Sequence, residues 1–422
     1  MRAPSLKAGL LAAATGLAAL TLGPAPEAAP DNFDAVERGR YLVILGDCVA
    51  CHMNPNGNHD GSQGFVGGRP IETPFGLIAT PNITPDRGTG IGTWSADEFY
   101  RAMHEGIRPG GARLYPAFPY TYFTKMTRGD VDSIYAYLNT LEPVHNPVDR
   151  NTLPFPFNIR ASMLAWNAMF FEPGEFRPDP NRSPEWNRGA YIVEGPAHCG
   201  ACHTPKNMLG GDRNSEHFAG GPLQGWFAAS ITNDQRLGLG SWSIDEIVEY
   251  LKTGRNARSA ASGPMAEVVE YSTGLMTDAD LRAIAVYLKE PPQPAPASPA
   301  RTPVAATDDR MKIGEAIYTD RCMACHTGGG QGVPNMFPRL AGSQVVQQEG
   351  SETVLRVVMQ GVRAAYTPHA PTSPAMPAFA WRLNDDQVAA VTTYIRNAWG
   401  NAAPAVSPGD AAHMRRLLED RP

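Results

Sequence analysis

The chain has 422 residues, of which 42% are hydrophobic and 18% charged, a composition typical of a globular protein rather than a disordered one. A chain of this length is expected to fold into about three domains. The net charge of −6 provides no basic footprint, which excludes nucleic acid as a partner. The 42 glycines and 39 prolines favour short helices separated by long loops.

The N-terminal residues have the pattern of a secretory signal. Arg2 and Lys7 form a charged region, an apolar run follows from Ala8 to Leu22, and the stretch from Ala25 to Ala29 offers small residues for cleavage. The apolar run is shorter than the roughly 20 residues that a membrane span needs. We therefore expect residues 1–29 to be a signal peptide, with an uncleaved anchor as the alternative.

The motif Cys-x-x-Cys-His occurs three times, at residues 48–52, 199–203 and 322–326, and includes all six cysteines. It is typical of c-type haem attachment, because two thiols on one helical turn add to the two porphyrin vinyl groups and the next histidine lies under the iron. The sequence thus predicts three haem c groups. The expected thioether residues are Cys48, Cys51, Cys199, Cys202, Cys322 and Cys325, and the expected proximal ligands are His52, His203 and His326.

Other uses of paired cysteines explain the pattern less well. A zinc site with four thiolates would leave a third pair and three histidines without a role. A redox dithiol does not require a histidine directly after the second cysteine in all three copies. Because every cysteine lies inside a motif, none is left for another disulfide.

Each motif lies in a repeat that opens with a short helix and closes with an amphipathic one. The expected closing helices are residues 130–141, 280–289 and 386–397, each preceded by a capping signal. Glycine lacks a Cβ, so helices can approach closely at one. We predict that a glycine of each opening helix faces a tyrosine of the closing helix. The pairs are Gly39 with Tyr137, Gly189 with Tyr287, and Gly314 with Tyr394.

The repeats define the expected domains. Repeat one covers residues 32–150, repeat two 185–290 and repeat three 308–400, with a proline-rich linker at 291–307. Repeats one and two share a middle segment, Gly90 to Ser95 and Gly238 to Ser243, whose serines are expected helix caps. Residues 410–418 are expected to form one short terminal helix.

These features resemble one known family over almost the whole mature chain. The order of the repeats, the two middle segments, the stretch Leu114 to Tyr120 and the tripeptide Gly263 to Met265 are similar to the three-haem cytochrome c subunit of bacterial membrane-bound alcohol, aldehyde and gluconate dehydrogenases. The resemblance implies an all-α fold of three tandem class I cytochrome c domains. Within the family, Phe118 resembles the variant in subunits paired with molybdenum hydroxylases of aldehydes or N-heterocycles.

The resemblance also implies a role and a place. Electrons would pass from a dehydrogenase catalytic subunit of the quinoprotein, flavin or molybdenum type, through the haems, to ubiquinone or a terminal oxidase. The chain would be periplasmic, on the outer face of the cytoplasmic membrane. The sequence itself contains no dinucleotide-binding Gly-x-Gly-x-x-Gly motif and no nucleophile elbow, so we do not expect it to be the substrate-oxidising subunit.

In this fold the distal methionine lies in a proline-rich loop before the closing helix. Met376 and Met265 fit that position, with Met276 as the alternative to Met265. Repeat one departs from the pattern, because Phe118 stands where a relative has methionine. We expect Met126 to be the distal ligand of haem 1, and Met103, His104 or an open site are the alternatives.

Two rival functions remain at this stage. An open haem 1 would suit a peroxidase or nitrite reductase, and the chain could also be a free-standing multihaem carrier. A subunit should instead retain an exposed apolar docking surface. The stretch from Leu153 to Phe171 is apolar, aromatic and outside the repeats, so it is the expected surface, with packing between domains as the alternative.

Overall fold

A computed structural model describes the chain except for residues 1–32, 55–63, 150–151, 293–297, 299 and 420–422. The predicted signal peptide and part of the predicted linker lie outside the described residues. Helices dominate, as the sequence predicts, and the described strands form three two-stranded antiparallel hairpins. Residues from Asp34 onward form one unit by their contacts.

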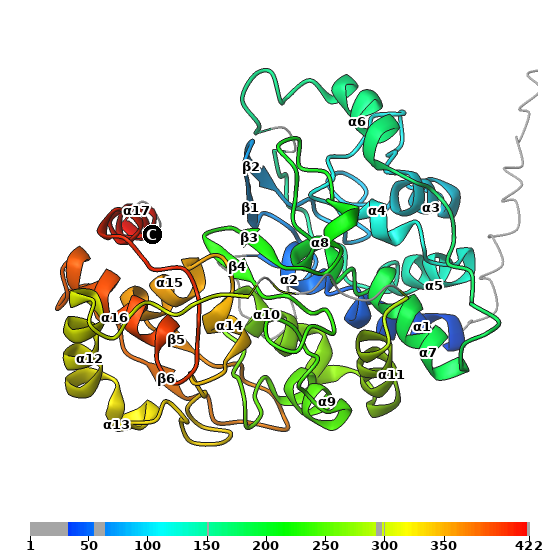
Figure 1. Ribbon diagram of the computed structural model, residues 1–422. Helices are drawn as coiled ribbons and strands as arrows, with labels where there is room; N and C mark the ends of the chain where they lie inside the picture. Colours follow the sequence, from blue (N-terminus) through cyan, green and yellow to red (C-terminus); the bar gives the residue numbers. More distant parts are fainter. Residues whose placement is uncertain (1–32, 55–63, 150–151, 293–297, 299, 420–422) are drawn as a thin grey trace, which may run out of the picture. The chain divides into compact units, whose positions relative to one another are not determined.

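The elements follow one another as shown in Figure 1. Repeat one contains α1 (Phe33–Leu45), α2 (Cys48–His52), β1 (Pro70–Thr73), β2 (Gly76–Ala79), α3 (Ala96–Glu105), α4 (Tyr120–Phe123) and α5 (Arg128–Leu138). A connection follows, with η1 (Arg160–Ser162) and α6 (Met163–Phe170). Repeat two contains α7 (Pro184–Glu194), α8 (Gly200–His203), η2 (Asn214–Glu216), β3 (Gly221–Leu223), β4 (Trp226–Ala228), α9 (Ile244–Thr253), α10 (Pro264–Tyr271), η3 (Thr273–Leu275) and α11 (Asp278–Lys289).

Repeat three contains α12 (Asp309–Arg321), α13 (Met323–His326), α14 (Gln344–Gln347), α15 (Glu352–Gln360), β5 (Val362–Arg363), β6 (Ala375–Met376) and α16 (Asp385–Asn397). The terminal helix α17 (Pro408–Glu419) confirms the short helix expected there. The closing helices α5, α11 and α16 begin one or two residues before the predicted starts, and only α5 ends early, at Leu138.

In each repeat the opening helix crosses the closing helix at the predicted glycine. A Cβ built at Gly39, Gly189 or Gly314 would lie 2.9, 2.9 or 2.6 Å from the Cβ of Tyr137, Tyr287 or Tyr394, respectively. It would also collide with a backbone carbonyl of the closing helix. The predicted pairing of glycine and tyrosine is confirmed, because only a residue without a side chain permits this crossing.

The helix caps agree with the sequence in part. Ser95, Ser243 and Asn384 form complete capping boxes, in which the third helical residue also binds the N-cap backbone. Thr127 and Thr277 each accept a bond from the N–H of the predicted partner, Asp130 and Asp280. The carboxylates of these aspartates bond to Arg38 and Arg188, because a buried carboxylate is best stabilised by a cation.

The buried side chains form two main cores. One continuous cluster joins repeats one and two, for example Leu42 and Ile134 with Ile192 and Ile284. A second cluster belongs to repeat three and packs α15, α16 and the terminal helix α17 together. Repeats one and two therefore share a hydrophobic core that repeat three does not enter.

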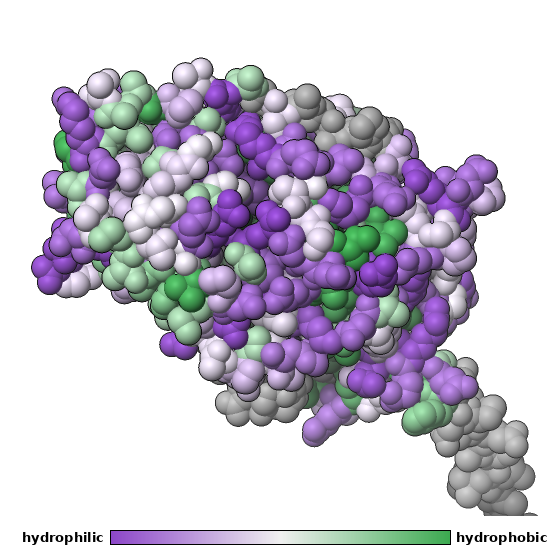
Figure 2. All heavy atoms as spheres, turned by 60° about the horizontal axis from the view of Figure 1, so that its bottom comes forward, coloured by the Kyte–Doolittle hydropathy of each residue, from purple (hydrophilic) through white to green (hydrophobic). Residues whose placement is uncertain are grey.

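The connection between repeats one and two is exposed only in part, since Leu153 is buried and Trp166 donates a hydrogen bond to the carbonyl of Leu209 in repeat two. Phe155 is 78% exposed, and Leu164 and Met169 on α6 are each 57% exposed, whereas Trp166 is buried. The face shown in Figure 2 is mostly hydrophilic with scattered hydrophobic side chains. None of the described helices combines the length and apolar character needed to cross a membrane.

Candidate haem-binding sites

The three cysteine pairs lie on the short helices α2, α8 and α13 or directly before them, and all six are unbridged thiols. Burial raises the pKa of Cys48 and of Cys199 to about 12 and that of Cys322 to about 11, so these thiols are protonated at neutral pH. In the described part of the chain, no group of three or more His, Cys, Asp or Glu side chains could hold a bare metal ion.

The three motif histidines have the same orientation. The Nδ1 atoms of His52, His203 and His326 lie 2.8, 2.6 and 2.9 Å from the backbone carbonyls of Pro81, Ala229 and Pro338. A carbonyl can only accept, so Nδ1 carries the proton and Nε2 carries the lone pair that can bind iron. Burial lowers the pKa of each ring, which favours this neutral form.

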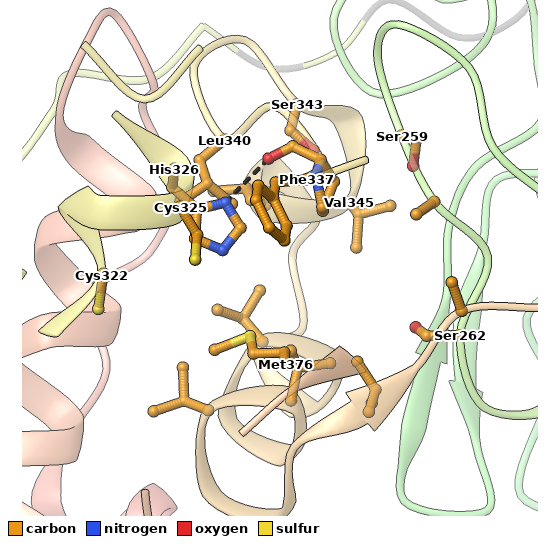
Figure 3. A pocket seen from close by; sticks show the side chains of 18 of the residues that line it. Ser259, Ser262, Cys322, Cys325, His326, Phe337, Leu340, Ser343, Val345 and Met376 are labelled. Atoms are coloured by element: carbon orange, nitrogen blue, oxygen red, sulfur yellow. Dashed lines mark hydrogen bonds between the residues drawn. The ribbon is translucent and has the colours of Figure 1, made fainter. Parts of the chain in front are cut away.

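Repeat three contains a cavity bounded by its motif and its predicted distal ligand. His326 and Met376 approach the cavity from opposite sides, and the dashed line in Figure 3 marks the bond that orients His326. Apolar side chains of α15 and of the following loop complete the walls, and the empty volume is about 1240 Å³ including the open mouth. Ser259 and Ser262 of repeat two lie at the far edge.

These residues fit haem c. The cavity supplies two free thiols, an imidazole with its Nε2 lone pair available and a facing thioether, which are the groups that attach and ligate a c-type haem. Its walls are lined with apolar residues such as Val354, Val358 and Phe379. A flat apolar macrocycle is the kind of group that such walls bury favourably.

In repeat two, Met265 is the second residue of α10 rather than part of a loop, because Pro264 begins that helix. Gly263 precedes it with φ 55°, and a Cβ added there would collide with the Trp226 ring. Met265 packs against the small cluster of Ala261, Ala266, Val269 and Ala365. Met276, the alternative ligand, is buried in the shared core.

In repeat one, the candidate ligands lie in different environments. Phe118 packs on Phe123, with ring centroids 5.3 Å apart. Met126 is fully buried, and Met103 on α3 is 6% exposed, both within the shared core. His104 stacks on Tyr100, which packs against that core, and the His104 Nε2 atom is buried with no hydrogen-bond partner among the described residues. The assignment of Met126 stays a prediction at this point.

Comparison with known proteins places the chain in a family. A family model described as cytochrome c matches residues 311–399. The cytochrome c subunit of a quinone-dependent alcohol dehydrogenase from Gluconacetobacter polyoxogenes is 39% identical, over 97% of this chain and 90% of that protein. The gluconate 2-dehydrogenase cytochrome c subunit of Pantoea cypripedii is 38% identical, over 91% of this chain and 90% of that protein.

The chain belongs to the family of dehydrogenase cytochrome c subunits. The predicted family resemblance is thereby confirmed, and membership implies covalently bound haem c. One of the subunits of nicotinate dehydrogenase from Pseudomonas putida is 40% identical over 94% of this chain, but the match covers only 34% of that longer protein.

One contact between the first haem motif and repeat two could not be predicted from the sequence. Arg69 donates hydrogen bonds to the carbonyl of Ala50, inside the first haem motif, and to Glu267 on α10, at 2.6 and 2.7 Å. It therefore ties the first motif to the helix that carries Met265. The residues lie far apart in the chain and share no pattern, so only the tertiary structure reveals the link.

The second haem motif of the cytochrome subunit lies against α4 of repeat one. The Tyr122 ring of repeat one lies against Gly200 of the second motif, where an added Cβ would be 2.7 Å from its hydroxyl oxygen. The same hydroxyl bonds to Asp212, in the loop after that motif. Phe123 makes an edge contact with His198, next to Cys199, with centroids 5.4 Å apart.

Proposed function

We propose that this chain carries electrons through three covalently bound haem c groups, each held in one of three tandem class I cytochrome c domains at residues 32–150, 185–290 and 308–400. The observation that supports it most is the threefold repetition of one arrangement. Each repeat has a thiol pair, a histidine fixed by a backbone carbonyl and a glycine crossing of two helices.

Each residue has a specific task in this function. The six cysteines hold the porphyrins, and His52, His203 and His326 bind iron through Nε2 because Nδ1 is engaged. Met376 and Met265 are proposed as distal ligands of haems 3 and 2. Bound haem iron supplies one-electron transfer, and a thioether ligand keeps its potential high.

The proposed donor is the catalytic subunit of a dehydrogenase, of the quinoprotein, flavin or molybdenum type. The relatives support it, because their names describe cytochrome subunits of alcohol and gluconate dehydrogenases. Nicotinate is an N-heterocycle, so the third relative supports the narrower resemblance drawn from Phe118. We propose ubiquinone or a terminal oxidase as the acceptor, and a periplasmic location on the outer face of the cytoplasmic membrane.

The haem count tests the proposal directly. Protein expressed with a haem-attachment system should retain three haems per chain after acid–acetone extraction, measured as the pyridine haemochrome. Replacing both cysteines of one motif by serine should remove one haem at a time, whichever motif is chosen. As a control, Cys→Ser variants are compared at equal folded protein, judged by far-UV circular dichroism. Two or fewer haems in fully loaded wild-type protein would contradict the proposal.

A further inference from the structure

The cavity of repeat three shows which face of α15 would meet a bound haem. Val354, Val357 and Val358 of α15 line that cavity. The helix ends where the N–H of Gly361 bonds to the carbonyl of Val357. This terminal bond provides a fixed point from which the positions of the other repeats can be matched.

The same terminal bond occurs in repeats one and two. The N–H of Gly106 bonds to Ala102 at the end of α3, and that of Gly254 bonds to Tyr250 at the end of α9. The residue after each acceptor is therefore equivalent in the three repeats. This residue is Met103 in repeat one, Leu251 in repeat two and the cavity-lining Val358 in repeat three.

Burial agrees with this alignment at two positions, because Phe99 and Met103 of α3 are buried, as are Val354 and Val358 of α15. The buried residues of α3 are Phe99, Ala102 and Met103, and these occupy the positions of the cavity-lining Val354, Val357 and Val358. By this alignment Met103 places a thioether at the position of the cavity-lining Val358, where the other two repeats have side chains that cannot ligate iron.

Met126 occupies a different kind of position. It stands directly before the N-cap Thr127, as Met276 stands before Thr277 and Leu383 before Asn384. A hydrophobic residue there packs against the fourth helical residue and fixes the helix entry. Those fourth residues are fully buried: Val131, Leu281 and Val388. Leu383 is not among the described residues that line the repeat-three cavity.

The remaining candidates in repeat one have other contacts. Phe118, at the place of the expected methionine, packs on Phe123 and has no donor atom for iron. The His104 ring stacks on Tyr100 at 4.8 Å, and its Nδ1 lies 3.5 Å from Thr124 Oγ1. His104 follows Met103 directly, so on a helix it is rotated away from the haem-facing side.

From this alignment we infer that Met103 supplies the distal thioether of haem 1 and that Met126 is a structural residue of the α5 entry. The inference rests on the proposed function, because it requires a haem at Cys48 and Cys51. The distal ligand of haem 1 would thus come from helix α3, whereas the proposed distal ligand of haem 3, Met376, lies on strand β6.

Leucine substitutions test the assignment, because Leu has nearly the volume of Met and no donor atom. Met103→Leu should open one haem, which becomes high-spin when oxidised and binds carbon monoxide when reduced. Met126→Leu should leave all the haem spectra unchanged. Met376→Leu serves as the reference for the amplitude of a single open haem, and the Met103→Leu/Met376→Leu double variant should open two haems.

A second substitution gives a gain of signal. Met103→His should replace the methionine–iron absorbance of one haem by a low-spin bis-histidine spectrum, visible by electron paramagnetic resonance. One open haem in Met126→Leu, or carbon monoxide binding by one haem of the wild-type protein, would overturn the inference. Three haems by pyridine haemochrome with an unaltered Met103→Leu spectrum would also overturn it, while leaving the proposed function intact.

Discussion

The hydroxyl of Tyr41, on the opening helix of repeat one, donates a 2.8 Å hydrogen bond to Asp280, on the closing helix of repeat two. The reciprocal bond also exists, because Tyr191 of repeat two donates to Asp130 of repeat one. Each aspartate is also paired with an arginine of its own repeat, Arg188 or Arg38. Two equivalent tyrosine–aspartate bonds thus join the two repeats across their shared core.

Repeat three lacks both partners of this contact. Counted from the crossing glycine, its residue equivalent to Tyr41 and Tyr191 is Ala316, and the third residue of its closing helix is Gln387. It contacts repeat two differently, through Thr353 of α15 and the backbone of Phe227 on β4. Repeats one and two therefore form a pair to which repeat three is attached.

Removal of the reciprocal bonds should weaken that pair. Tyr41→Phe and Tyr191→Phe each delete a hydrogen bond to a charged carboxylate, and we expect each to lower the free energy of unfolding by about 1.5–3 kcal/mol. Denaturant titration followed by tryptophan fluorescence measures the change. Tyr394→Phe in repeat three is the matched control, since its hydroxyl has no hydrogen-bond partner in the described part of the chain. If Tyr41→Phe and Tyr191→Phe lowered the free energy of unfolding no more than Tyr394→Phe does, the two bonds would contribute nothing to stability.

The same contact should make stability depend on pH. Burial opposes the charged form of Asp280, but bonds from Arg188 and Tyr41 outweigh it and lower the pKa of this carboxyl. Its contribution is therefore full above the unfolded value of about 3.9 and is lost as pH falls through the lower folded value. The stability difference between wild type and Asp280→Asn should be constant near neutral pH and shrink below about pH 4. A difference that grows on acidification would contradict the assignment.

The glycine crossings should tolerate no side chain. Gly189→Val would place atoms against the Ala283 carbonyl and the Tyr287 Cβ, so α7 and α11 must separate. We expect a loss of at least about 1–3 kcal/mol by overpacking, measured as a lower thermal midpoint. Gly129→Ala is the control, because nothing lies within 4 Å of its added Cβ. That helical substitution should be neutral or stabilising by up to about 1 kcal/mol.

The exposed connection should contribute to partner binding. Leu164→Ser and Met169→Ser remove apolar surface from α6 without touching a haem motif, so we expect weaker association with the catalytic subunit and unchanged haem spectra. Burial of one such side chain is worth about 1.5–3 kcal/mol, roughly a tenfold change in affinity or more. Ile313→Ser on α12, at a side chain 50% exposed, is the control. Unchanged co-purification of the α6 variants would favour a merely structural connection.

Local patterns in the sequence were sufficient for the parts of the fold that are themselves local. The haem motif works within one helical turn, so its spacing alone predicted the thiols and the histidines. Capping signals placed the closing helices to within three residues at either end, and the glycines were recognisable by their repeated position before each motif. The carbonyl partners of His52, His203 and His326 had no such signal, because each comes from a loop elsewhere in its repeat.

Only the tertiary structure decided which helix faces are buried and which residues pair between repeats. A methionine reads the same in sequence whether its sulfur meets a cavity or fills a core, and Met103 and Met126 both lie in the shared core, so their proposed roles rest on the alignment of α3 with α15. Asp130 and Asp280 read as cap residues, yet their carboxylates join two repeats. The sequence by itself determined the expected sites of haem attachment and the helices around them, because those features are set by neighbours in the chain. The pairing of repeats one and two arose only from folding, because it depends on groups more than sixty residues apart.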